Sequence, residues 1–185
     1  MRIFIAIELE DEMRAYLADV QERTRRECKR GNFTPPENFH LTLRFIGEAT
    51  GQDVELLKEA MEETGFRNRN FPLTLDKIGF FPKGTRGVLW TGVQQNAALL
   101  RIFSTLEKNL SKQGFPREKK GLSPHITLGR DVEPFRGFQE VQRKVIVEKK
   151  TMLVTKISLM ESVRMGPRLI YKPIYSVNLQ EEHQK

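Results

Sequence analysis

The chain has 185 residues, and its 31 lysines and arginines against 24 aspartates and glutamates give a formal net charge of +7 at pH 7. This length suits one domain of ordinary size with a substantial core. With 38% hydrophobic and 30% charged residues, the composition excludes a disordered tail and a membrane-embedded chain. The apolar run at residues 3–7 is too short for a transmembrane helix or for the core of a signal peptide, so we expect neither.

Cys28 is the only cysteine, which excludes an internal disulfide and a thiolate metal cluster and indicates a reducing, cytoplasmic setting. The three histidines, His40, His125 and His183, are too few for a multi-histidine metal centre, so we expect no metal and no cofactor. The excess of basic residues favours an anionic partner such as nucleic acid.

Strand and helix patterns alternate through the first half of the chain. Residues 2–9 alternate as a strand, in which Phe4 faces away from the isoleucines at positions 3, 5 and 7. Apolar residues at helical spacing predict a helix over residues 11–30, ended by Gly31 and carrying basic side chains on a solvated face. The remaining elements predicted here are a strand at 39–46, a helix that begins with a capping box at 50–53 and ends near Thr64, and a hairpin of strands at 72–81 and 86–93.

The second half follows a similar plan. Its predicted elements are a helix at 96–113, a basic loop at 116–121, a strand at 124–130, a short helix at 138–144, and strand-like runs at 151–163 and 169–179. Strands that follow one another directly favour antiparallel pairing, and this mixed order of elements is typical of the α+β class. No Ser/Gly/Pro-rich linker divides the chain, so we expect one domain over residues 1–185.

Two of the histidines lie in nearly identical sequences, His40-Leu41-Thr42-Leu43 and His125-Ile126-Thr127-Leu128. In a strand, residues i and i+2 share a face, so each segment places its histidine and threonine together and its aliphatic residues on the opposite, core-facing side. The triplet Leu-Thr-Leu is common in strands and recurs at residues 73–75 without a histidine, so the triplet alone predicts nothing. A second histidine with the same neighbours predicts a functional pair.

Two imidazoles and two hydroxyls suit acid–base chemistry at a phosphate. Imidazole titrates near pH ~6.5, so at neutral pH one ring can accept a proton while the other donates one. Threonine hydroxyls are compact donors for a phosphate oxygen. No third imidazole or paired carboxylate accompanies the motifs, and no phosphate-binding glycine loop or nucleophile elbow occurs. We therefore predict metal-free cleavage at phosphorus.

The chain resembles the two-histidine (2H) phosphoesterases, whose mark is a pair of His-x-Thr-x motifs. It is most similar to the branch of RNA 2′,3′-cyclic phosphodiesterases, also called 2′-5′ RNA ligases, and the likeness covers nearly the whole chain. It includes the segments RIFIAIEL, PPENFHLTLRFIGE, SPHITLGR and LMESVRMGPRLIYKPI. The resemblance implies an α+β, bilobal fold in which two antiparallel sheets face a central groove, with helices on the outer faces. Each of two pseudo-symmetric lobes would carry one motif, at 40–43 and at 125–128.

The resemblance also implies catalytic roles. His125 would act as the proton acceptor that activates water, and His40 as the proton donor to the departing ribose oxygen. Thr42 and Thr127 would complete the site. The product would be an RNA with a terminal 2′-phosphate.

Two further residues are candidate substrate contacts. Arg130 follows the second motif at a position where relatives often carry a basic residue, although a strand-end arginine on the surface fits equally well. Phe4 offers a stacking surface for a base, with ordinary core packing as the alternative. The basic loop at 117–120 is a candidate for contacts with the RNA backbone, and His183, in the polar tail, has no expected role.

The expected partner is an RNA that ends in a 2′,3′-cyclic phosphate, tRNA halves included, and the protein is expected to be a cytoplasmic monomer without a membrane contact. Several alternatives stay open. The same acid and base serve 2′-5′ ligation, with a ribose hydroxyl in place of water. A related enzyme could act on a small cyclic nucleotide, and a non-catalytic RNA-binding module could share the fold.

Overall fold

The computed structural model describes residues 1–182, so His183 lies outside the described range. The helices are α1 (Asp11–Arg25), α2 (Gly51–Arg67), α3 (Ala97–Lys112), α4 (Phe138–Lys144) and the 3-10 turn η1 (Pro36–Asn38). The strands are β1 (Arg2–Glu8), β2 (Cys28–Phe33), β3 (His40–Glu48), β4 (Phe71–Lys83), β5 (Arg86–Val93), β6 (His125–Pro134), β7 (Thr151–Val154), β8 (Lys156–Met165) and β9 (Arg168–Asn178). The predicted α+β class is confirmed.

The named strands form one curled sheet in the order β7-β4-β5-β6-β3-β1-β8-β9, and β2 pairs with β6 beside this path. All of these pairings are antiparallel, as the direct strand connections predicted. We call strands β7, β4, β5, β6 and β2 the β6 half, and strands β3, β1, β8 and β9 the β3 half. The two sheets implied by the resemblance are therefore two halves of one sheet, and each half contributes one motif strand.

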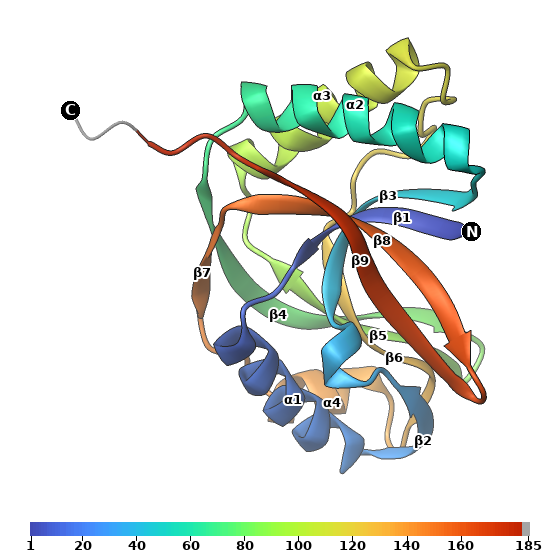
Figure 1. Cartoon of the computed structure of the whole chain (residues 1–185). Helices are drawn as coiled ribbons and strands as arrows, with labels where there is room; N and C mark the ends of the chain where they lie inside the picture. The colour runs from blue at the N-terminus through green and yellow to red at the C-terminus, as the bar shows by residue number, and fades with distance from the viewer. Residues whose placement is uncertain (183–185) are drawn as a thin grey trace.

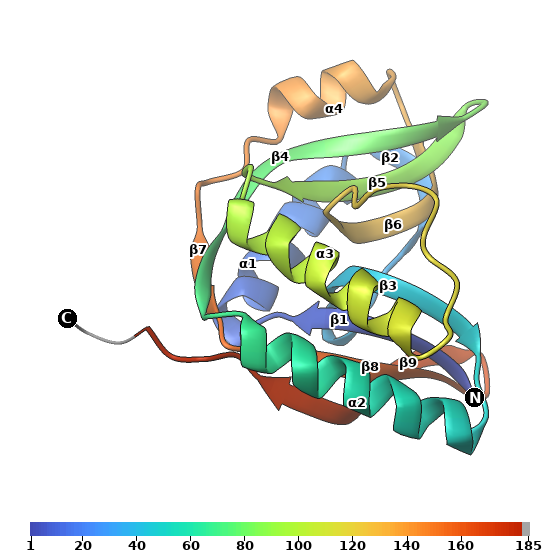
Figure 2. The ribbon, with the colours of Figure 1, turned by 90° about the horizontal axis from the view of Figure 1, so that it is seen from above.

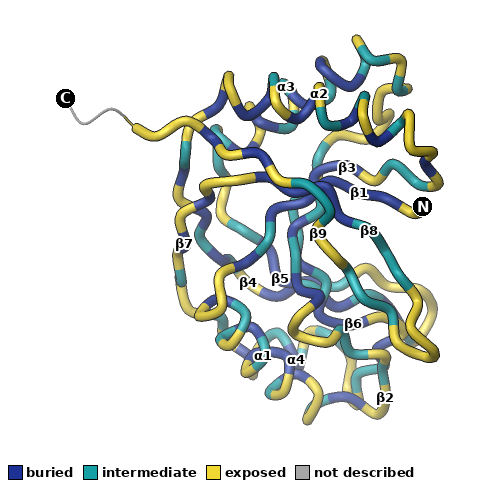
Figure 3. Tube along the Cα trace, viewed as in Figure 1, coloured by how far each residue is buried: buried dark blue, intermediate teal, exposed yellow. Residues whose placement is uncertain are grey.

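Helices cover both ends of this arrangement. In Figure 1, α2 and α3 lie together above the strands, and α1 and α4 lie below them; Figure 2 shows the same layers from above. The predicted capping box at the start of α2 is confirmed, because Thr50 and Asp53 exchange side-chain and backbone hydrogen bonds. The buried residues concentrate where the strands cross the middle of the molecule, while the tip of the β8–β9 hairpin is exposed (Figure 3). Among residues 1–182, no helix is long and apolar enough to cross a membrane.

The predicted helix over residues 11–30 is wrong in its last part. Helix α1 ends at Arg25, and the chain turns into β2, which pairs with β6. Of the basic residues taken for a helix face, Arg23 and Arg25 do lie in the last turn of α1. Lys29 and Arg30 belong instead to β2, and both lie within salt-bridge distance of Glu133 on β6. Gly31 is not a helix stop. A Cβ atom at this position would lie 2.9 Å from the side chain of Val132, so the lack of a side chain at Gly31 lets β2 approach β6 closely.

The predicted run over residues 151–163 consists of two strands. Strand β7 pairs with β4 in the β6 half, whereas β8 pairs with β1 and β9 in the β3 half. The change of partner occurs at Thr155, whose carbonyl accepts a hydrogen bond from the amide of Leu179 at 2.8 Å. No glycine or proline marks the break in the sequence, so the two strands resemble one continuous run.

Candidate active site

The two motifs meet where β3 and β6 pair. Leu41 and Ile126 lie opposite each other in the register, and both are 0% exposed. Because side chains alternate along a strand, the histidine and threonine of each motif point to the other face of the sheet. All four of these side chains line one groove of about 750 Å³. The predicted pairing of the two motifs in one site is therefore what the structure contains.

One backbone carbonyl and one threonine hydroxyl orient the His40 ring. Its Nδ1 lies 2.7 Å from the carbonyl oxygen of Asn38, and its Nε2 lies 2.9 Å from Oγ1 of Thr42. A carbonyl oxygen only accepts hydrogen bonds, so Nδ1 carries a proton and Nε2 is the atom available for proton transfer. The side chain of Asn38, 4% exposed, donates to the carbonyl of Leu169 and accepts from the amide of Tyr171. Strand β9 thereby holds the residue that orients His40.

The His125 ring is oriented in the same way. Its Nδ1 lies 2.7 Å from the carbonyl oxygen of Ser123, two residues earlier, as Asn38 precedes His40. Nδ1 therefore donates and Nε2 is again the exchangeable nitrogen. No hydrogen bond within residues 1–182 involves Nε2 of His125. The two histidines thus present the same nitrogen, in the same tautomer, to the groove.

Each motif histidine packs against two aromatic side chains. The ring centroids of Phe4 and Tyr171 lie 4.9 and 5.1 Å from that of His40. On the other half, the centroids of Phe81 and Trp90 lie 5.3 and 6.1 Å from that of His125. These contacts hold the rings in place. Sequence reasoning missed Tyr171, Phe81 and Trp90, because nothing in their local sequence indicates that they come to lie beside a motif strand.

Phe4 borders the groove but is only 4% exposed. It packs against His40 and makes an edge contact with Tyr171, at 5.0 Å between ring centroids. These contacts leave little free ring surface for a nucleobase. The position favours the alternative weighed from the sequence, in which Phe4 packs in the interior, and here that packing supports the catalytic ring.

The surroundings of His40 lower the pKa of its ring. Burial lowers the pKa of its imidazole below the ordinary 6.5, and the positive charges of His125 and Arg130 lower it further. The hydrogen bond to the Asn38 carbonyl opposes this change by favouring the charged ring. Arg130 itself lines the groove and is exposed. The structure therefore brings this sequence candidate, a cation, into the groove that the two motifs line.

The groove extends mainly over the β3 half. Its wall there includes Arg2, Phe45, Arg164 and Tyr171. The guanidinium of Arg2 lies over the Phe45 ring, 5.3 Å from the centroid, and half of the Phe45 side chain is exposed. Cationic and aromatic groups of this kind are suited to a nucleotide. None of them was singled out in the sequence, since scattered arginines and phenylalanines carry no local signal.

A buried ion pair anchors the loop that precedes the second motif. Nη1 of Arg44, on β3, lies 2.7 Å from both carboxylate oxygens of Glu107, on α3. Arg44 also donates to the carbonyl of Pro116, and Glu107 accepts from the amide of Glu118 at 2.9 Å. The basic residues at 117–120 are exposed, but the loop does not line the groove. Its expected contact with RNA is therefore not part of this site.

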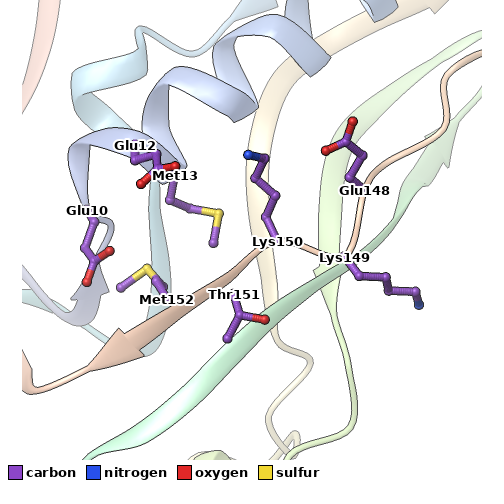
Figure 4. Close-up of a pocket in the computed structure, with 8 residues that line it drawn as sticks. All are labelled: Glu10, Glu12, Met13, Glu148, Lys149, Lys150, Thr151 and Met152. Atoms are coloured by element: carbon purple, nitrogen blue, oxygen red, sulfur yellow. The ribbon is translucent and has the colours of Figure 1, made fainter.

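A second hollow, of about 360 Å³, lies between the start of α1 and the segment before β7 (Figure 4). It is lined by Glu10, Glu12, Met13, Glu148, Lys149, Lys150, Thr151 and Met152. It contains neither histidine nor motif threonine. Within residues 1–182, no group of three or more His, Cys, Asp or Glu residues is arranged to hold a metal ion.

Two imidazoles and two hydroxyls that converge in a groove lined by three arginines and two glutamates define a two-histidine phosphoesterase site. The family described as LigT like Phosphoesterase matches the chain over residues 7–90. The RNA 2′,3′-cyclic phosphodiesterase of Aeropyrum pernix is 36% identical over 149 residues, which are 76% of this chain and 82% of that protein. The protein of the same name from Thermotoga maritima is 34% identical over 134 residues, 70% of each chain.

The fold agrees with these relatives. The crystal structure of Escherichia coli LigT complexed with 3′-AMP superimposes with a TM-score of 0.77, at 26% identity, and the match covers 96% of this chain and 97% of that one. The chain belongs to the LigT-like phosphoesterase family of the 2H superfamily, and it is an enzyme of that family.

Proposed function

We propose that the protein hydrolyses the 2′,3′-cyclic phosphate at the end of an RNA to a 2′-phosphate, by acid–base catalysis without a metal. The observation that carries the proposal is that both motifs meet in one groove, with Nε2 of each histidine presented by a hydrogen bond at Nδ1. The names of the relatives from Aeropyrum pernix and Thermotoga maritima support the choice of substrate.

The shape of the groove supports the division of roles. The groove lies mainly on the side of His40, where Arg2 and Phe45 can hold a ribose and its base. In an in-line displacement the attacking and departing oxygens lie on opposite sides of phosphorus. The departing 3′-oxygen of the bound ribose therefore faces His40, and the attacking water faces His125.

The reaction can then be followed atom by atom. The water oxygen attacks phosphorus while Nε2 of His125 takes its proton, and the bond from phosphorus to the 3′-oxygen breaks. Nε2 of His40 gives its proton to that oxygen. The ribose keeps a phosphate on its 2′-oxygen and regains a 3′-hydroxyl.

The lowered pKa of His40 is compatible with an acid. Burial and the neighbouring cations disfavour its charged form in the free enzyme. A bound phosphate anion brings the opposite charge next to the ring and favours the imidazolium again. Once protonated, an imidazolium of low pKa is the stronger donor to the departing oxygen.

The hydroxyls and Arg130 act on the phosphate. Thr42 already bonds Nε2 of His40 at 2.9 Å, and Thr127 occupies the equivalent place after His125. Both can donate to the non-bridging oxygens, whose negative charge the Arg130 guanidinium also stabilises. Phe4 contributes by packing on His40.

We further propose that each half of the sheet forms one of two related lobes, and that they work as a monomer, since one chain supplies every group in the groove. The cytoplasm is the expected location, supported by the single, buried cysteine. RNAs with a 2′,3′-cyclic phosphate, such as tRNA halves, are the proposed partners. Joining of such an end to a second RNA through a 2′-5′ bond uses the same acid and base.

The test is incubation of a short oligonucleotide ending in 2′,3′-cyclic phosphate with the protein in excess EDTA. We expect the product to gain one water and to carry a 2′-phosphate, by mass and ³¹P NMR analysis. His40→Ala and His125→Ala should each slow its formation about 10²-fold or more. Turnover of a free cyclic nucleotide alone would instead assign a small-molecule substrate. RNA binding without turnover would indicate a non-catalytic module, and activity only after addition of a divalent ion would exclude the metal-free mechanism.

A further inference from the structure

An aromatic surface lies beside His125, outside the part of the groove described above. On β4, Phe80 stacks on Phe138 of α4, at 5.2 Å between ring centroids, so this side of the strand faces the helix. The adjacent Phe81 points to the opposite side. Its register partner across β5 is Val88, and the next pair on that face joins Gly79 to Trp90. This face of the β6 half therefore carries two aromatic rings next to the second motif.

The two rings and the histidine form one cluster. The centroids of Phe81 and Trp90 lie 5.1 Å apart, and the Phe81 ring meets His125 edge to face at 5.3 Å. Trp90 is also the register partner of Thr127. Phe81 is 42% exposed although its ring contacts His125. The cluster therefore offers an accessible apolar ring surface within reach of the base.

Glycines hold the indole flat on the sheet. A Cβ atom at Gly79 would overlap the Trp90 ring, and one at Gly92 would lie 3.2 Å from it. The indole of Trp90 therefore lies over Gly79 and Gly92, flat against the sheet. The interior side of the same strands is filled by Ile78 and Leu89, each 1% exposed. The Trp90 indole lies on the other face and is not part of the buried core.

Positive charge accompanies the rings. Lys83 lies two residues after Phe81 on β4 and therefore shares the face of that ring. Lys77 lies nearby on the same strand, at the register irregularity between Leu75 and Ile78. Both are exposed, and no ion pair within residues 1–182 involves either. Aromatic rings flanked by unpaired cations are suited to a nucleoside and its phosphates.

We propose that Phe81 and Trp90 form a subsite for a second nucleoside, the one whose hydroxyl attacks the cyclic phosphate. This inference rests on the proposed function and on its division of roles. The departing 3′-oxygen lies on the side of His40, so an attacking group approaches from the side of His125, where this surface lies. A base stacked there brings a 5′-hydroxyl to Nε2 of His125 in the place of water.

The step balances in the same way as hydrolysis. The 5′-oxygen of the second nucleoside bonds to phosphorus, and its proton goes to His125. The bond to the 3′-oxygen breaks, and His40 protonates that oxygen. The product is a 2′-5′ diester with a free 3′-hydroxyl, and no further reactant is needed. The subsite thereby determines how often an RNA hydroxyl replaces water.

The experiment measures this competition within one reaction. An oligonucleotide ending in 2′,3′-cyclic phosphate is mixed with increasing amounts of a short RNA bearing a 5′-hydroxyl, and the transfer and hydrolysis products are quantified together. For the wild-type protein we expect the transfer rate to saturate with the second RNA. For Phe81→Ala the ratio of transfer to hydrolysis should fall about fivefold or more, the lower end of what one stacked base contributes.

The ratio is internally controlled. Because both routes use His125, any displacement of that ring by the substitution lowers both products and leaves their ratio unchanged. Trp90→Leu should lower the ratio as Phe81→Ala does. The matched control is Phe45→Ala, an exposed aromatic ring on the side of His40, which should weaken both routes equally.

Each outcome is decisive. Hydrolysis without transfer by the wild-type protein, transfer that rises linearly with the second RNA, or an unchanged ratio in both β4–β5 variants would overturn the subsite and leave the proposed function intact. A ratio that falls equally in Phe45→Ala would also overturn it. Absence of both products would overturn the proposed function, and the subsite with it.

Discussion

Leu41 of β3 and Ile126 of β6 form the one register pair that joins the two motif strands within residues 1–182. The strands are antiparallel, so His40 lies beside Thr127, and Thr42 lies beside His125. Each motif histidine thus neighbours the threonine of the other motif. Leu41 and Ile126 are both fully buried, so the core of the protein sets the distance between the two motifs.

The first prediction separates the roles of the histidines. His40→Ala and His125→Ala should each lower kcat about 10²-fold or more, as expected for a positioned acid or base. With a substrate whose leaving oxygen is already a good leaving group, His40→Ala should recover most of its activity because that oxygen no longer needs a proton. His125→Ala should stay impaired. Recovery of His125→Ala instead would reverse the two roles.

The second prediction concerns the threonines. Thr42→Val and Thr127→Val keep the shape of the side chain and remove the hydroxyl that faces the phosphate. Each should lower kcat by about 10²–10³-fold, the usual effect of losing one preorganised donor to a developing charge. Steady-state kinetics on the cyclic substrate will show it. A rise in KM with kcat unchanged would mean that the hydroxyls serve binding only.

The third prediction concerns the pH above which kcat/KM falls, the alkaline limb of its pH profile. The acid must be protonated in the free enzyme, and burial lowers the pKa of His40 below 6.5. Thus kcat/KM should fall as pH rises through a value lower than 6.5. Tyr171→Ala uncovers one side of the ring and should move this limb to higher pH. If Tyr171→Ala left the alkaline limb of kcat/KM unchanged, that limb would report a group other than His40.

The fourth prediction is the effect of the same pKa on stability. A histidine whose pKa is lower in the folded than in the unfolded protein binds more protons when unfolded. Its contribution is fully present above pH 6.5 and is lost as pH falls below that value. The carboxylates whose pKa is lowered, Asp53, Glu133 and Glu140, have ordinary values of 4.5 or less, so they act at lower pH.

The measurement is thermal unfolding between about pH 5 and pH 7.5, a range that brackets the ordinary histidine pKa. His40→Gln keeps a polar side chain but cannot titrate, so the melting temperature of this variant should change less over the range than that of the wild-type protein. An equal change in both proteins would mean that His40 is not the group responsible.

The fifth prediction concerns the ion pair of Arg44 and Glu107, whose side chains are 8% and 12% exposed. Arg44→Met leaves a carboxylate without its cation in a buried position, so it should lower the free energy of unfolding by about 3–5 kcal/mol. Adding Glu107→Gln should restore part of the loss, because it removes the uncompensated charge. Urea titration gives both values.

The matched control for that pair is Arg67→Met, which removes the partner of Glu63 on the exposed face of α2. We expect it to change the stability by about 1 kcal/mol or less, as is usual for a surface pair. If Arg44→Met were no more destabilising than this control, the loop before the second motif would not depend on the pair.

Much of the active site could be predicted from local sequence. The spacing of His40 and Thr42, repeated at His125 and Thr127, determines which side chains share a strand face, because alternation along a strand is a local property. The cap at Thr50, the short helix at 138–144 and the hairpin before β5 follow from equally local rules and are confirmed. Arg130 was singled out because it lies two residues after the second motif, where relatives often carry a basic residue.

The tertiary structure decided what each of these strands touches. A strand pattern shows which face is apolar but not which strand pairs with it. For this reason the residues around Cys28 were taken for a helix, and the change of partner at Thr155 left no mark. The rings of Tyr171, Phe81 and Trp90 reach the histidines only because β9, β4 and β5 lie beside them in space. Contacts between distant segments depend on the packing of the whole chain, so the environment that tunes the two histidines exists only in the folded protein.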